Sequence, residues 1–187
     1  MRRTILLVVA CTLALTLCAA AVEPADVLKV DYFANANTAG APDGTLRITN
    51  PGTSGGNLCA AIYVFDSGEE LSECCSCKTT PNGLKTLSVN TDLTSNPLTG
   101  VTLNTGAIRI VSTPTVGGTC PLPTRLTPTA ALRSWTTHIQ NSSFSETESA
   151  STDATLSAAE QSALQNACFA VQLVGSTKGV CTCGTGD

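Results

Sequence analysis

The stretch Leu58-Cys59-Ala60-Ala61-Ile62-Tyr63-Val64-Phe65 is apolar at every position and rich in side chains that favour strands. Such a run predicts a central β-strand covered on both faces. Shorter runs that alternate apolar and polar residues surround it, at 28–32, 46–49, 86–89 and 108–110. In the first of these, Lys29 and Asp31 alternate with apolar neighbours, which predicts a half-buried strand. Turn residues separate the runs at roughly ten-residue spacing. The sequence therefore predicts a mainly β protein, an antiparallel β-sandwich, with an immunoglobulin-like arrangement as one such architecture.

The second half of the chain has a different texture. Residues 113–130 are rich in Thr and Pro and predict an extended surface loop, held near its middle by Cys120. Residues 132–139 predict one more strand. The Ser-, Thr- and Glu-rich residues of the 140s and early 150s predict a loop, because they show no apolar periodicity.

One helix is predicted, at about 158–173. Ser157 and Glu160 have capping-box spacing, in which the serine accepts from the Glu160 N–H and the glutamate carboxylate reaches back. Gly175 is the expected C-terminal stop. The helix has one apolar face at i, i+4 and i+7 spacing, formed by Leu164, Cys168 and Val171. Residues 180–183 predict a short end strand.

Residues 1–21 predict a cleaved export signal, with two arginines, an apolar run at 4–17 and three alanines. Residues 22–187 would then form a single domain. No later segment approaches 18 apolar residues, so no transmembrane span is predicted. Lipoprotein anchoring is disfavoured, because Cys18 follows a bulky leucine and the apolar run before Cys11 is too short. We expect secretion to the exterior or the cell surface, and the periplasm also fits.

The charge balance excludes some partners. Removal of the two arginines of the export signal takes the formal net charge from −4 to −6. An acidic chain with scattered basic residues has no footprint for nucleic acid or an anionic membrane. No cofactor is predicted, the expected partner is an extracellular molecule or surface of unknown kind, and the sequence leaves the oligomeric state open.

Eight cysteines follow the export signal and predict four disulfides in an exported protein: Cys59, Cys74, Cys75, Cys77, Cys120, Cys168, Cys181 and Cys183. If 71–78 is a strand, Leu71, Cys75 and Cys77 share one face and Cys74 lies on the other. Cys59, on the preceding strand, is the expected local partner of one of these three cysteines. If Cys74, Cys75 and Cys77 make no bridge among themselves and Cys181 does not pair with Cys183, about 54 of the 105 possible connectivities remain open. We expect reduction of all bridges to unfold the protein.

The cluster Cys74-Cys75-Ser76-Cys77 also has three functional interpretations. The spacing of Cys74 and Cys77 is that of redox motifs, but the helix N-terminus that activates such thiols is missing from the pattern. The same pair could join Cys181 and Cys183 in a zinc site, which an oxidising compartment disfavours. Haem attachment would require a histidine where Lys78 stands. A free thiol would favour a thiol-active protein, and four closed bridges would exclude redox catalysis.

Other candidate sites are weaker. His138 is the one histidine, and without a Gly-x-Ser-x-Gly elbow we expect a surface or partly buried polar residue rather than a catalytic base. Trp135 is expected to be a core residue. An acidic group predicts a solvated turn and is a weak calcium candidate because it lacks EF-hand spacing: Asp66, Glu69, Glu70 and Glu73. No catalytic residue is predicted.

The segments 58–66, Glu73-Cys74-Cys75-Ser76-Cys77, Thr80-Pro81-Asn82-Gly83-Leu84 and 92–98 resemble a group of uncharacterised secreted bacterial proteins with the same Cys-rich core and divergent tails. The resemblance covers about residues 45–112 and implies a bacterial source, but no activity and no functional residues. The predicted function is a secreted or cell-surface, non-enzymatic structural or binding module of unknown ligand, with adhesion as one form of it. The alternative is a secreted enzyme, or a thiol-redox or metal-binding protein that uses the cysteine cluster.

Overall fold

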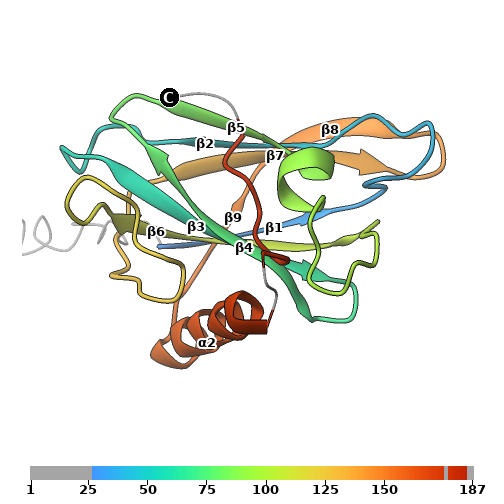
Figure 1. Cartoon of the computed structure of the whole chain (residues 1–187). Helices are drawn as coiled ribbons and strands as arrows, with labels where there is room; N and C mark the ends of the chain where they lie inside the picture. Colours follow the sequence, from blue (N-terminus) through green and yellow to red (C-terminus); the bar gives the residue numbers. More distant parts are fainter. Residues whose placement is uncertain (1–26, 175–176, 185–187) are drawn as a thin grey trace, which may run out of the picture.

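Two antiparallel sheets pack face to face in the computed structural model, which describes residues 27–174 and 177–184 (Figure 1). The predicted export signal, its cysteines Cys11 and Cys18, and Gly175 lie outside the described residues. The elements are β1 (Leu28–Phe33), β2 (Thr45–Thr49), β3 (Leu58–Asp66), β4 (Leu71–Thr79), β5 (Leu84–Ser88), the helical turn η1 (Val89–Leu93), β6 (Gly106–Pro114), β7 (Arg133–Gln140), β8 (Ser145–Ala150), β9 (Thr152–Ala154) and α2 (Ala158–Val174). The mainly β fold with one C-terminal helix is therefore confirmed.

The first sheet has the strand order β4-β3-β6-β1-β9 and the second has β5-β2-β7-β8. The chain passes from the second sheet to the first at Ser151, between β8 and β9. Figure 1 shows α2 beneath the first sheet, on the side away from the second. The molecule thus has three layers, with a helix outside one of the two sheets.

Strand β3 lies between β4 and β6 and is buried on both faces, as predicted. Ala60, Ile62 and Val64 belong to the core between the sheets. Ala61 and Tyr63 belong to a second apolar cluster that lies between the first sheet, α2 and the loop after β6. The continuous apolar run therefore supplies two cores at once.

Strand β4 carries an extra residue opposite β3. Val64 pairs with Glu73 whereas Phe65 pairs with Leu71, so Ser72 has no partner in the ladder. A bulge shifts the side-chain alternation by one position. Leu71 consequently packs with the helix-side cluster, and its predicted placement on one face with Cys75 and Cys77 is wrong.

Three local predictions need correction. The predicted loop of the 140s and early 150s contains β8 and β9, because pairing with β7 and β1 orders them although β8 is fully exposed. Residues 180–183 form an extended segment without strand pairing, held instead by disulfides. Lys29 and Asp31 are buried rather than solvent-facing, since Asp153 pairs with the lysine and His138 lies 3.3 Å from the aspartate.

Helix α2 agrees with its prediction in extent and in its buried face. The Ser157 hydroxyl accepts a hydrogen bond from the Glu160 N–H at 3.1 Å, as expected of an N-cap. The Glu160 carboxylate does not complete the capping box but forms an ion pair with Arg109 on β6. This pair ties the start of the helix to the first sheet. No helix in the described ranges is long and apolar enough to cross a membrane.

Gly106 begins β6 at a point where no side chain fits. A Cβ there would lie 2.0 Å from the Phe65 carbonyl oxygen and 2.7 Å from the Phe33 ring. We expect Gly106→Ala to lower the free energy of unfolding by about 2 kcal/mol, because the strand backbone must move. Gly56→Ala is the matched control, since nothing lies within 4 Å of its Cβ position. Equal denaturation midpoints for the two variants would contradict this expectation.

Candidate functional site

All eight cysteines within the described residues are bridged. The pairs are Cys59–Cys120, Cys74–Cys168, Cys75–Cys181 and Cys77–Cys183. The prediction of four disulfides is confirmed, and none of these cysteines offers a free thiol. The predicted local partnership of Cys59 is wrong. On β4, Lys78 lies opposite Cys59 in the ladder. Cys74 is the β4 cysteine on the same face as Cys59, but it lies opposite Tyr63, four positions further along β3.

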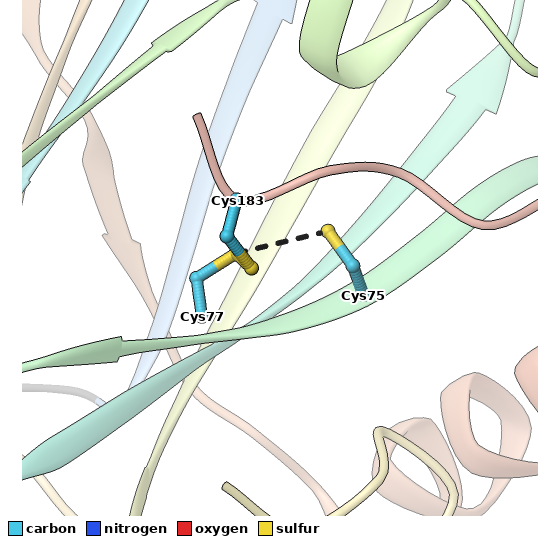
Figure 2. A group of neighbouring side chains, drawn as sticks. All are labelled: Cys75, Cys77 and Cys183. Carbon is cyan, nitrogen blue, oxygen red and sulfur yellow. Dashed lines mark hydrogen bonds between the residues drawn. A yellow bond between two sulfur atoms is a disulfide. The ribbon is translucent and has the colours of Figure 1, made fainter. Parts of the chain in front are cut away.

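The two faces of β4 carry different bridges. Cys74 points towards α2, where it bonds to Cys168. Cys75 and Cys77 point the other way and hold the C-terminal segment, 177–184, across the edge of the sandwich (Figures 1 and 2). The Cys75 and Cys77 sulfurs are 3.9 Å apart. Two separate bridges therefore lie side by side at one point.

The C-terminal segment is also held by hydrogen bonds that do not involve sulfur. Asn96 is central, because its side-chain amide donates to the carbonyls of Thr177 and Val180 and its carbonyl accepts from the Gly179 N–H. Thr182 donates from its hydroxyl to the Asp92 carboxylate at 2.6 Å and from its N–H to the Asp92 carbonyl. The segment is thus docked independently of its two disulfides.

Glu73 lies beneath this segment with no exposed surface. One carboxylate oxygen accepts from the Asn96 N–H at 2.8 Å, and the other is buried without a hydrogen-bond partner. Burial raises the pKa of Glu73 to about 7, against a smaller lowering by the Asn96 hydrogen bond. The prediction that Glu73 belongs to a solvated turn is wrong.

The other three acidic candidates stay at the β3–β4 turn. The Asp66 carboxylate accepts from the N–H groups of Gly68 and Glu70, which closes the turn. Glu69 and Glu70 are exposed. Within the described residues, the one group of three or more His, Cys, Asp or Glu side chains close enough to share a metal ion is formed by cysteines. The predicted calcium ligands are therefore not brought together.

His138 is buried between the sheets, not at the surface. Its Nδ1 lies 3.1 Å from the Tyr32 carbonyl oxygen, and its Nε2 lies 2.9 Å from the Ser149 hydroxyl and 3.3 Å from the Asp31 carboxylate. In a hydrolytic triad the carboxylate would orient the ring through Nδ1 and leave Nε2 to the serine. Here Asp31 competes with Ser149 for one nitrogen. The network, which Ser151 joins by donating to Asp31, braces the point where the chain changes sheets.

An apolar groove lies between α2 and the loop that follows β6. Its cavity is about 800 Å³ and is lined by Val116, Thr119, Pro121, Leu122, Thr124, Arg125, Gln165, Asn166, Phe169, Gln172 and Leu173. Four of these are exposed apolar residues: Val116, Leu122, Phe169 and Leu173, the last two with 54% and 67% of their surface exposed. Monomeric proteins rarely leave such residues grouped without a use.

Both walls of the groove are fixed to the first sheet by covalent bonds. The loop is tied through Cys120 to Cys59 on β3, and the helix through Cys168 to Cys74 on β4. The buried Tyr63 hydroxyl also donates to the loop carbonyl of Pro123 at 2.7 Å. The groove is therefore formed before any ligand binds.

The electrostatics of the groove are simple. Arg125 is exposed and is its one charged lining residue. Its guanidinium forms no ion pair with any residue of the described ranges. The groove thus combines apolar surface with a single unneutralised positive charge, in a protein of formal net charge −4.

Sequence reasoning did not identify this groove. Phe169 and Leu173 form a second apolar stripe on α2, beside the buried face that contains Cys168 and Val171. This stripe is the sequence signal that could have indicated an exposed apolar surface on the helix. Nothing in the sequence showed that the loop would face it. Trp135, expected in the core, lies half-buried on the outer face of the second sheet.

Comparison of the chain with protein-family models, curated proteins and solved structures gave no match.

Proposed function

We propose that this chain is a secreted, non-enzymatic binding module whose groove holds an apolar segment of a partner protein that carries a carboxylate. The observation that carries this proposal is a groove with exposed apolar lining and with both walls bonded to one sheet. Four closed disulfides suit an exported protein, as does the predicted export signal.

The shape of the groove favours a peptide as its occupant. It is an open trough along the side of a helix, bordered by Phe169 and Leu173 on one wall and Leu122 on the other. A peptide can lay alternate or i, i+4 apolar side chains into such a trough. A fatty acid needs an enclosed cavity that removes most of its surface from water.

Charge selects the kind of peptide. Arg125 is the one charge in the lining, and guanidinium pairs best with carboxylate in a bidentate arrangement. A second copy of this acidic chain is a poorer partner, because the net charges of the two copies repel. Fixed walls lower the entropy cost of binding, which raises affinity without further contacts.

A random peptide library displayed on phage tests the proposal. We expect the native protein to enrich apolar peptides that contain Asp or Glu, and Phe169→Ser to weaken their binding at least tenfold, as for a central apolar anchor. Arg125→Gln should remove the preference for acidic peptides while apolar ones still bind.

Leu84→Ser is the matched control, since Leu84 is 52% exposed but lies outside the groove. Its affinity for the selected peptides should equal that of the native protein. If Phe169→Ser binds the enriched peptides as well as the Leu84 variant does, the groove is not the binding site.

A further inference from the structure

The two adjacent bridges place sulfur atoms at metal-site distances. The Cys75 and Cys77 sulfurs are 3.9 Å apart, and the Cys183 sulfur lies within 4.8 Å of both (Figure 2). Cys181 is bonded to Cys75, so a fourth sulfur lies next to this group of three, although outside it, and would have to turn towards the metal. Zn–S bonds of about 2.3 Å in a tetrahedron set neighbouring sulfurs about 3.8 Å apart. The separation on β4 already has this value.

We propose that these four cysteines, once their two bridges are reduced, form a tetrahedral thiolate site for one Zn²⁺ ion. The ligands come as two Cys-x-Cys pairs, Cys75 with Cys77 on β4 and Cys181 with Cys183 on the C-terminal segment. Cys74 is not among them, because it faces α2 on the opposite side of the strand. The sequence spacing indicates a set of Cys74 and Cys77 with Cys181 and Cys183, whereas the proposed site has Cys75 in place of Cys74.

The ligands would stay in place after reduction. Cys75 and Cys77 sit in a ladder with β3, and the C-terminal segment is docked by Asn96 and Asp92 through hydrogen bonds that contain no sulfur. The Cys74 N–H also donates to the Gly179 carbonyl at 2.9 Å. A site whose ligands are held in advance loses little entropy when the metal binds.

Cys183 is the accessible sulfur. It is only partly buried and lines an open cavity of about 510 Å³, whereas Cys75, Cys77 and Cys181 are buried. Exchange begins where a thiolate can reach a disulfide sulfur. The co-reactant is an external thiol, and the first bond to break is Cys77–Cys183.

Thiol–disulfide exchange opens both bridges in sequence. An external thiolate bonds to the Cys183 sulfur and releases the Cys77 thiolate, which bonds to Cys75 at 3.9 Å and expels the Cys181 thiolate. Three more external thiolates reduce the mixed disulfide and the Cys75–Cys77 bond. Four thiols become two disulfides, and the protein gains four thiols, which release four protons when Zn²⁺ binds.

Limited reduction of the full chain with a phosphine, followed by Zn²⁺ and alkylation mapping, tests this. We expect Cys77–Cys183 to open before Cys74–Cys168, one Zn²⁺ per chain by native mass spectrometry, and protection of the four ligand cysteines from alkylation. Co²⁺ in place of Zn²⁺ should give a thiolate charge-transfer band. Cys181→Ser with Cys183→Ser should weaken Zn²⁺ binding at least a hundredfold, whereas Cys59→Ser with Cys120→Ser should retain it.

The proposal is overturned if Cys74–Cys168 opens first, or if the partly reduced protein loses its near-ultraviolet circular dichroism before Zn²⁺ is added. Alkylation of the four cysteines at equal rates with and without Zn²⁺ would also overturn it. This last measurement uses the unmutated chain, so it decides the matter even if the serine variants fail to fold.

Discussion

Replacing Cys74 and Cys168 together by alanine is expected to lower the free energy of unfolding by about 4–5 kcal/mol. The bridge closes a loop of 94 residues, and removing it restores that freedom to the unfolded chain. Small domains have only about 5–15 kcal/mol of stability, so the loss is severe. Chemical denaturation followed by circular dichroism measures it.

The effect should also be local. Helix α2 buries only three side chains against the first sheet, and Cys168 is one of them. Without the bridge, we expect α2 to become sensitive to protease while the core between the sheets still folds at low denaturant. If the groove binds peptides as proposed, this variant should bind them more weakly, because one wall is no longer fixed.

The double variant Cys59→Ala with Cys120→Ala is the matched comparison. Its loop of 61 residues gives a similar entropic loss, about 4 kcal/mol, but leaves the helix bonded to β4. Helix protection should therefore survive in this variant. Equal protease sensitivity of α2 in the two variants would show that the Cys74–Cys168 bridge does not hold the helix.

Periodicity was enough to predict the layers but not their connections. The apolar run of β3 and the buried face of α2 could be predicted from the sequence, because burial dictates the spacing of their apolar residues. Strand β8 was not, since an exposed edge strand has no buried face to leave a pattern. It is ordered by its partner β7, which single-sequence periodicity cannot reveal.

The prediction that Cys59 pairs with a β4 cysteine was wrong for a different reason. Sequence proximity suggested Cys59 as a partner for the β4 cysteines, but antiparallel register places it opposite Lys78. Register depends on the turn and on the bulge at Ser72, neither of which spacing alone encodes. The groove was missed for the same reason, since its loop wall is positioned by Cys59–Cys120.

Glu73 was misread because the sequence groups it with Glu69 and Glu70, which are exposed at the turn, while its own position on β4 faces inward. The structure shows that its carboxylate is buried, with one oxygen unpaired and the other bonded to Asn96. Asn96 in turn holds the carbonyls of Thr177 and Val180. The charge state of one side chain therefore bears on how firmly the C-terminal segment is held.

Stability should fall as pH rises from about 4.5 to about 7. Burial raises the pKa of Glu73 from 4.5 in the unfolded chain to about 7 in the folded one. Below the lower value both states are protonated and the folded state bears no penalty. Between the two values the unfolded chain ionises and the folded chain does not, which favours unfolding. The full difference, about 3 kcal/mol, is lost once the pH exceeds the folded pKa.

Glu73→Gln isolates this effect because the amide stays neutral and can still accept from the Asn96 N–H. We expect the variant to match the native protein at pH 4.5 and to exceed it by about 3 kcal/mol at pH 8, measured by urea denaturation. Glu70→Gln, on the exposed turn of the same hairpin, should parallel the native profile throughout. Since other carboxylates titrate in all three proteins, the decisive quantity is the difference between profiles. A constant difference between Glu73→Gln and the native protein from pH 4.5 to 8 would mean that Glu73 is ionised in the folded state across that range, and that its unpaired oxygen is solvated.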